Sequence, residues 1–198
     1  MSPGGLHLVV PGARLLPQYE EALEAGWSPD TERDISREQL TRLRRNRRAF
    51  LASLTRQDGT ILTASGREVP RLPSQVFWLD DGEFCGVADF RFVPGSDLLP
   101  DYVPGHIGYS VVPWKRRRGY ATRALGLVLN VARGRGLRRV QITCDEDNTA
   151  SRSVILKNRG ILTGTRLHEG ERPKLVFNID LTTGGGGAAI TPSERAPI

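Results

Sequence analysis

Cysteine is scarce in this 198-residue chain, which contains only Cys85 and Cys144. Neither residue lies in a CxxC pair or in a cluster with histidines, which argues against a disulfide scaffold and against a structural zinc site. Long apolar runs are also missing, and the first residues lack the basic segment, apolar stretch and cleavage site of a secretory signal. We therefore expect a cytoplasmic protein with no membrane partner and no bound metal.

Lysine is equally scarce, because only Lys115, Lys157 and Lys174 occur. The chain nevertheless has 28 Lys and Arg residues against 22 Asp and Glu residues, for a formal net charge of +6. Arginine therefore carries nearly all of the positive charge, and its fixed guanidinium group suits partners that bear phosphate. A nucleic acid and a phosphorylated cofactor are both such partners, so overall charge does not choose between them.

The apolar periodicity predicts one mixed α/β domain over residues 1–181. Predicted strands cover residues 6–10, 76–79, 84–92, 106–112, 140–144, 162–167 and 175–181. Predicted helices cover residues 15–25, 36–54, 120–132 and 150–158, and a capping box of Ser36 and Gln39 is expected to begin the second helix. Residues 56–74 are predicted to be a loop with at most one short strand, at 60–63. The Gly- and Pro-rich tail, 182–198, is predicted to be flexible and to lie outside the fold.

The sharpest motif is a strand, SVVP, that leads through RRRGYA into a helix. The beginning of a helix presents unpaired N–H groups and the positive end of the helix dipole, and glycine lets a ligand approach the backbone closely. Together with Lys115 and the neighbouring arginines, these features predict a turn that binds an anion. The turn is neither a Walker A loop nor a GxGxxG motif. The alternative is a basic connector with a capping glycine.

Two motifs in the expected order carry a resemblance to a known family. Arg116 to Ala121 match [QR]-x-x-G-x-[GA], the central motif of the GNAT superfamily of acyl-CoA-dependent N-acyltransferases. The second motif of that superfamily is matched, after the strand VQITC, by Asn148, Ser151, Val154, Lys157 and Gly160. The chain resembles a small bacterial branch of the superfamily over nearly its whole length except the tail. The resemblance implies a central, mostly antiparallel, splayed sheet flanked by helices, with acetyl-CoA as cosubstrate.

The resemblance also implies which residues bind acetyl-CoA. Backbone amides of the turn would bind the pyrophosphate, at Arg117, Arg118, Gly119, Tyr120, Ala121 and Thr122. The strand before the turn would pair with the pantetheine amides through Val111 and Val112. Asn148 and Ser151 of the second motif are further cofactor-binding candidates. For Asn148 the alternative is a helix cap, a position that asparagine favours.

Acyl transfer to an amine needs an uncharged nitrogen, stabilisation of the developing oxyanion and a proton for the departing thiolate. His106 stands where several relatives carry a carboxylate base, and its ordinary pKa suits that role; the alternative is a packing residue. Asp89 and the acidic residues 145–147 are other candidates, and the latter also fit a solvated turn or a subsite for a cationic acceptor. A ping-pong route through Cys144 is less favoured, because a lone cysteine in a strand is usually a small core residue.

The usual acid of the family is missing, because Ile155 stands where many relatives have a tyrosine. Tyr109 and Tyr120 are the available tyrosines, and Tyr109 is the candidate we retain, although two-residue periodicity places it on the strand face opposite His106. Arg159 also stands where this branch often has glycine, so the end of the second-motif helix is expected to be reshaped.

The sequence therefore predicts an N-acetyltransferase that moves an acetyl group from acetyl-CoA to a primary amine by direct attack. The acceptor is a small molecule, a peptide or a protein, and a homodimer is left open. The missing tyrosine keeps open an acyl-CoA-binding sensor without transferase activity. A third alternative, RNA or ribosome binding, depends on the arginines of the second helix at positions 37, 42, 44, 45, 47 and 48. It is disfavoured because no aromatic platform accompanies them and acidic residues 20, 21 and 24 are available to pair with them.

Overall fold

The computed structural model describes residues 5–31, 33–62, 66–167 and 172–182. The first half of the chain contains β1 (His7–Val9), α1 (Leu16–Glu24), α2 (Ser36–Arg45), α3 (Arg47–Leu54), β2 (Thr60–Leu62), β3 (Glu68–Pro70), β4 (Ser74–Asp80) and β5 (Phe84–Arg91). The second half contains β6 (Ile107–Val111), the 3-10 turn η1 (Pro113–Lys115), α4 (Tyr120–Gly134), β7 (Arg139–Asp145), α5 (Thr149–Lys157), β8 (Ile161–Arg166) and β9 (Lys174–Asp180).

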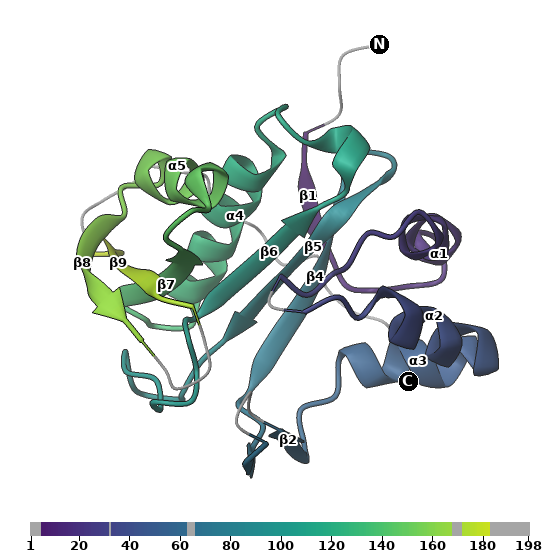
Figure 1. The fold of residues 1–198 in the computed structure, drawn as a ribbon, viewed down its shortest axis with the longest axis horizontal. Helices are drawn as coiled ribbons and strands as arrows, with labels where there is room; N and C mark the ends of the chain where they lie inside the picture. Colours follow the sequence, from purple (N-terminus) through teal and green to yellow (C-terminus); the bar gives the residue numbers. More distant parts are fainter. Residues whose placement is uncertain (1–4, 32, 63–65, 168–171, 183–198) are drawn as a thin grey trace, which may run out of the picture.

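Seven of the strands form two antiparallel sheets that meet at β6 and β7, and β2 and β3 form a separate two-stranded sheet. One sheet has the order β1-β4-β5-β6, and the other has the order β7-β9-β8 (Figure 1). At the junction the His106 N–H donates to the carbonyl of Gln141 at 2.8 Å, and beyond it β6 and β7 share no ladder and belong to separate sheets. The predicted splayed, mostly antiparallel sheet flanked by helices is therefore confirmed.

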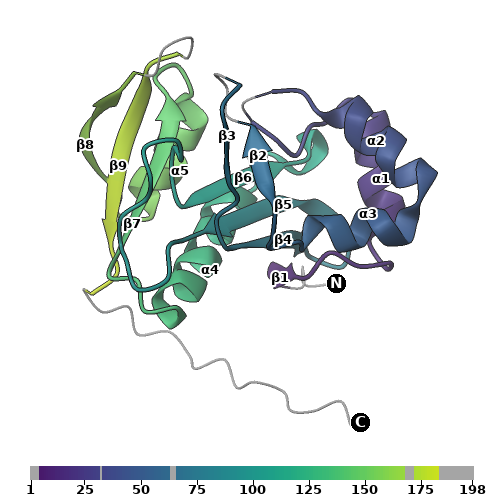
Figure 2. The ribbon, with the colours of Figure 1, turned by 90° about the horizontal axis from the view of Figure 1, so that it is seen from below.

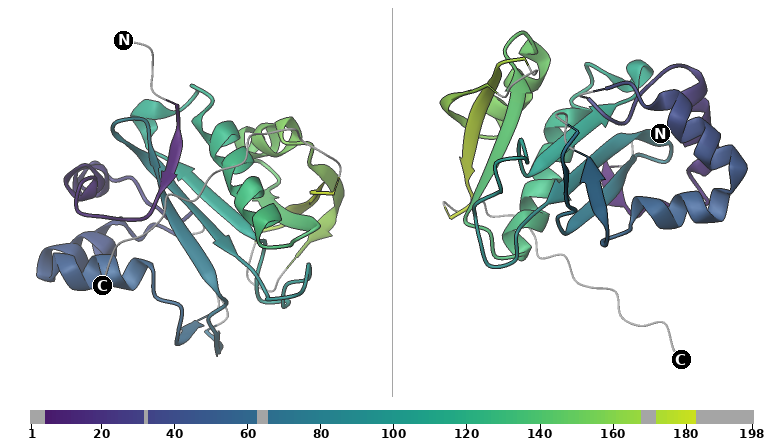
Figure 3. Two further views of the ribbon diagram at one scale, coloured as in Figure 1. Left: turned by 180° about the vertical axis from the view of Figure 1, so that it is seen from behind. Right: turned by 60° about the horizontal axis from the view of Figure 1, so that its bottom comes forward.

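Helices cover both faces of the β1-β4-β5-β6 sheet. Helices α1–α3 lie on one side, whereas α4 lies on the other, with α5 and the second sheet beyond it (Figures 2 and 3). The alternation of side chains along the strands explains this arrangement, because Ala88 and Phe90 of β5 pack with α4 while Val87 packs with α1. Each face of the sheet thus has its own buried core.

The two cores have different compositions. On the α4 side, aliphatic residues of that helix at helical spacing are fully buried: Ala124, Leu125, Val128 and Ala132. On the other side an aromatic cluster fills the space, and in it Tyr19 stacks on Trp78 with ring centroids 4.9 Å apart. Fully burying a large apolar side chain contributes about 2 kcal/mol. Both cores therefore hold the sheet that carries the candidate site.

The predicted helix over residues 36–54 is in fact two helices. Asn46 leaves the helical conformation, with φ −161° and ψ 97°, and its side chain accepts a hydrogen bond from the N–H of Ala49. Asparagine competes for local backbone donors in this way, which favours a cap over a helix interior. The apolar stripe continues across the break and therefore concealed it.

The capping box predicted at Ser36 and Gln39 is also wrong. The Asp34 carboxylate accepts from the N–H of Ser36 at 2.9 Å, while Gln39 is buried and accepts a hydrogen bond from the Tyr19 hydroxyl. Gln39 therefore packs against α1 and does not cap its own helix.

The segment predicted as a loop, 56–74, contains a hairpin in which Ile61 of β2 pairs with Val69 of β3. The short strand predicted at 60–63 is found up to residue 62, and β3 was missed because Pro70 and the neighbouring polar residues hide its period. Residues 63–65, and the predicted tail apart from Thr182, lie outside the described residues. Among the helices that are described, none is long and apolar enough to cross a lipid bilayer.

Candidate active site

A cavity of about 730 Å³ lies between β6, β7, the beginning of α4 and α5. Its volume is typical of a site for a cofactor or small ligand. Residues from all four elements line it, together with Thr31 of the α1–α2 loop. The separation of β6 from β7 creates this space, because two paired strands would leave no room between them.

The turn between η1 and α4 forms one wall of the cavity. Gly119 immediately precedes α4 with φ 80°, and Arg117 adopts φ 61°, which is uncommon for a residue other than glycine. The first N–H groups of α4, at Tyr120, Ala121 and Thr122, have no partner within the helix. A Cβ placed on Gly119 would meet nothing within 4 Å, so the backbone here is open to a ligand.

This wall fits a diphosphate. Unpaired amides, the positive end of the α4 dipole and the side chains of Arg116 and Arg117 all favour an anion at this place. The turn is also bonded to the end of β6, because Arg116 Nε donates to the Val111 carbonyl at 3.0 Å.

Most of the predicted cofactor-binding residues come together around the cavity. Those that line it are Val111, Arg117, Gly119, Tyr120, Ala121, Thr122, Asn148 and Ser151. Arg118 and Val112 do not line it. Val112 is fully buried, its N–H donates to the Cys85 carbonyl at 3.0 Å, and its own carbonyl accepts from the Lys115 N–H. Its backbone is thus used within the protein, because the chain turns into η1 one residue earlier than the sequence suggested.

Asn148 caps α5, as the alternative interpretation of this residue held. Its Oδ1 accepts from the N–H of Ser151 at 2.9 Å. The residue also lies on the cavity wall, so capping fixes the position of the side chain at the site.

Tyr109 of β6 reaches across the cavity to α5. Its hydroxyl lies 2.9 Å from the Ser151 hydroxyl. Ser151 and Ile155 are four residues apart on one helix face, and Ile155 is fully buried in the core. Burial raises the pKa of Tyr109 to about 12, so the hydroxyl keeps its proton at neutral pH.

His106 lies beneath the junction of the two sheets and does not line the cavity. The side chain is fully buried, and its Nδ1 accepts from the N–H of Gln141 at 3.0 Å. Together with the bond from its own N–H to Gln141, this contact ties β6 to β7 at the point from which they diverge. Nε2 is buried with no hydrogen-bond partner among the described residues.

The burial of His106 predicts a pH dependence of stability. Burial lowers the pKa of His106 from 6.5 to about 4, so the folded protein holds the imidazole neutral while the unfolded chain binds a proton below pH 6.5. This contribution is fully present above pH 6.5 and is lost as the pH falls toward 4, by up to about 3 kcal/mol. We expect His106→Asn to remove that part of the slope when urea unfolding is compared at pH 7 and pH 4.5. An identical slope in both proteins would contradict the buried, neutral imidazole.

The other candidates from the sequence are paired or buried. Cys144 lines the cavity but is buried, and burial raises the pKa of its thiol. Asp89 forms an ion pair with Arg91 and does not line the cavity. Asp145 lines it and forms an ion pair with Lys174 at 2.8 Å.

The arginine-rich face of α2 and α3 is tied to α1. Arg44 pairs with Glu20 and Glu24, and Arg47 pairs with Glu20 at 2.7 Å. Such pairs are typical of a solvated helix surface, the interpretation that the sequence favours. They reduce the positive charge that this face presents to phosphate.

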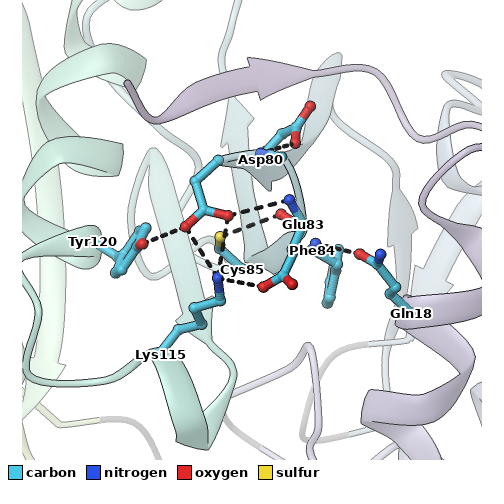
Figure 4. A network of polar contacts seen from close by, with 9 residues as sticks. Gln18, Asp80, Glu83, Phe84, Cys85, Lys115 and Tyr120 are labelled. Carbon is cyan, nitrogen blue, oxygen red and sulfur yellow. Dashed lines mark hydrogen bonds and ion pairs between the residues drawn. The ribbon is translucent and has the colours of Figure 1, made fainter. Parts of the chain in front are cut away.

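Sequence reasoning missed a polar network beneath the turn. The Asp81 carboxylate, in the turn between β4 and β5, contacts Lys115 of η1 and Tyr120 of α4 (Figure 4). The only signal in the sequence is the pair of aspartates before Gly82, which indicates a turn and nothing about its distant partners.

Comparison with known protein families agrees with the motifs and the fold. The family described as "Acetyltransferase (GNAT) family" matches residues 16–161, a range that contains both motifs. The chain belongs to the GNAT family of acetyltransferases, which confirms the predicted family and the predicted class of enzyme. A comparison with curated proteins found no match.

Three proteins illustrate the solved structures with this fold. RimJ of Mycobacterium smegmatis, in complex with CoA-disulfide, has a TM-score of 0.64 and 22% identity over 90% of this chain and 83% of its own. An acetyltransferase from Salmonella typhimurium that modifies the N-terminal serine of a 50S ribosomal subunit protein has a TM-score of 0.56 and 17% identity over 88% and 94%. The microcin C7 self-immunity acetyltransferase MccE, in complex with acetyl-CoA and AMP, has a TM-score of 0.56 and 13% identity over 91% and 97%. These similarities establish the fold.

Proposed function

We propose that this chain is a cytoplasmic N-acetyltransferase that transfers the acetyl group of acetyl-CoA to a primary α-amine by direct attack. One observation carries the proposal: the open, glycine-capped beginning of α4 forms a wall of the cavity between the separated strands. Family membership supports the same reaction.

In this proposal the turn and β6 bind acetyl-CoA. The amides of residues 119–122, with Arg117, hold the pyrophosphate, and Val111 lies beside the pantetheine. Acetyl-CoA supplies a thioester whose carbonyl carbon accepts the amine nitrogen as the bond to sulfur breaks. The chain's own residues orient the two reactants and supply the proton that the departing sulfur takes up.

Tyr109 is our candidate for the group that donates a proton to the departing sulfur. It lines the cavity, it keeps its proton at neutral pH, and its hydroxyl contacts the same face of α5 on which Ile155 replaces the usual tyrosine. We assign His106 a structural role, because its imidazole is buried at the sheet junction. A direct attack fits better than a covalent route, since burial disfavours the thiolate of Cys144.

The site favours an acceptor that needs little help from a base. Asp145 is the one carboxylate among the described residues that line the cavity, and it is already paired with Lys174. An α-amine has a reference pKa near 8, against about 10.4 for a lysine side chain, so far more of it is uncharged at neutral pH. The fold neighbour that acts on an N-terminal serine supports a peptide or protein acceptor.

Two matched peptides test this proposal. One has a free N-terminal serine and no lysine, and the other has the same sequence with a blocked N-terminus and one internal lysine. With acetyl-CoA at pH 7 we expect the first to gain the mass of one acetyl group on the order of 100-fold faster, the ratio of the uncharged amine fractions.

Faster acetylation of the lysine peptide would contradict the α-amine assignment. Tight CoA binding without transfer to either peptide, or to a panel of small amines, would favour the acyl-CoA sensor that Ile155 keeps open.

A further inference from the structure

The turn proposed to bind the diphosphate has a run of positive charge and one strained residue, so contacts from the rest of the protein are needed to hold its geometry. Lys115, Arg116, Arg117 and Arg118 follow one another in the sequence, and Arg117 adopts a left-handed backbone conformation. Like charges at this spacing repel one another, and a non-glycine residue in that conformation costs about 1 kcal/mol. Neither effect favours the observed geometry before an anion arrives.

Asp81 contacts the residues on both sides of this turn. Lys115 Nζ, on the upstream side, donates to both carboxylate oxygens of Asp81 at 3.2 and 3.1 Å. The Tyr120 hydroxyl, on the downstream side, donates to Asp81 Oδ2. Figure 4 shows the carboxylate between these two side chains. A single group thus spans the four residues that form the turn.

The ion pair at the centre of the network, between Asp81 and Lys115, is buried. The side chains of Asp81 and Lys115 are each only 10% exposed, and Glu83 adds a second contact to Lys115 at 2.8 Å. Burial alone would raise the pKa of Asp81, but hydrogen bonds from Tyr120 and Lys115 lower it to about 2. The carboxylate therefore stays ionised at any physiological pH, and its partners offset its repulsion of a nearby anion.

The turn that carries Asp81 is itself held by contacts with α1 and with the segment just before that helix. The Phe84 N–H donates to Gln18 Oε1 at 2.6 Å, and Asp80 forms an ion pair with Arg14 (Figure 4 includes the first contact). Asp81 thus lies in an anchored turn and outside the cavity, since it is not among the residues that line it.

We infer that Asp81 is a positioning residue for cofactor binding, which holds the turn of residues 116–119 in the geometry that receives the diphosphate of CoA. The inference rests on the proposed function. It differs from a general stabilising role because it predicts a selective effect on ligands that carry the diphosphate. Preorganisation of this kind raises affinity without a direct contact.

Calorimetric titration of CoA into four proteins tests the inference. Asp81→Asn keeps the shape but removes the charge, and we expect CoA affinity to fall about tenfold, the effect of losing a charged hydrogen bond. Tyr120→Phe removes only the downstream contact, and a smaller loss of about threefold is expected. Glu83→Gln is the matched control: it also removes a negative partner of Lys115 but leaves the contact with Tyr120, so CoA affinity stays within about twofold.

Pantetheine, which lacks the diphosphate, distinguishes a positioning role of Asp81 from a general structural role. A general structural role would lower the affinity for CoA and for pantetheine alike. The weak binding of pantetheine can be followed by shifts of amide resonances, and we expect Asp81→Asn to leave it within about twofold of the wild-type affinity. Unchanged CoA affinity in Asp81→Asn, equal losses in Asp81→Asn and Glu83→Gln, or equal losses for CoA and pantetheine would each overturn the inference. If Asp81→Asn does not fold, unchanged CoA affinity in Tyr120→Phe overturns it. Failure of the wild-type protein to bind CoA would instead overturn the proposed function, and the inference with it.

Discussion

Replacing Gly119 by aspartate is expected to lower the affinity of this protein for CoA by at least about 100-fold. The substitution places a carboxylate at the beginning of α4, on the open side of the turn, where the unpaired amides would receive the diphosphate. The new carboxylate and the diphosphate carry like charge, and placing them side by side costs several kcal/mol. The added side chain also occupies the space for the ligand. Calorimetric titration of CoA measures the loss.

Gly136→Asp is the matched control for this variant. Gly136 follows the other end of α4 with φ 85°, close to the 80° of Gly119, and a Cβ on either residue meets nothing within 4 Å. Both substitutions therefore cost about the same backbone strain, on the order of 1 kcal/mol, but only one lies in the cavity. Equal CoA affinity in the two variants would refute the assignment of the turn to the diphosphate.

Replacing Tyr109 by phenylalanine is expected to lower kcat by roughly 100-fold and to leave the dissociation constant for CoA within about twofold. The substitution removes the hydroxyl beside Ser151 and retains the ring that fills the space between β6 and α5. A proton donor acts on the leaving sulfur during the reaction, so its loss affects the chemical step more than binding. Initial rates with saturating acceptor peptide measure the effect.

Tyr102→Phe provides a control for the loss of one tyrosine hydroxyl. Tyr102 donates to the Pro70 carbonyl at 3.2 Å and does not line the cavity. We expect wild-type kcat in this variant, within about twofold. A Tyr109→Phe enzyme with wild-type kcat would show that Tyr109 is not the proton donor. Tyr120 and solvent would then be the remaining candidates for that donor.

The local features of the site could be predicted from the sequence. The glycine before α4 and the basic residues around it form a continuous segment, and a helix beginning needs no distant partner to present its amides. Asn148 was similarly foreseen, because a capping residue acts on a backbone N–H three residues away. Both predictions depend only on the backbone conformation of a few consecutive residues, which the residue types at those positions determine.

The features that were missed depend on contacts between distant segments. Asp81 meets its partners 34 and 39 residues further along the chain, and no periodicity reveals such a pairing. His106 has the chemistry of a base and stands at the strand entrance, but only the fold shows that it is fully buried and hydrogen-bonded to Gln141 of β7. The break at Asn46 was hidden for a different reason, because the apolar stripe continues through the cap.

Titration of the isotope-labelled protein with CoA, followed by its amide resonances, tests directly whether CoA binds at the beginning of α4. We expect saturation at one CoA per chain, with the largest shifts at Gly119, Tyr120, Ala121 and Thr122 and smaller ones along β6. We expect little change on the arginine-rich face of α2 and α3, where Arg44 and Arg47 are paired with α1. A folded protein whose amides near Gly119 do not respond to CoA, or respond only on that arginine-rich face, would contradict CoA binding at the beginning of α4.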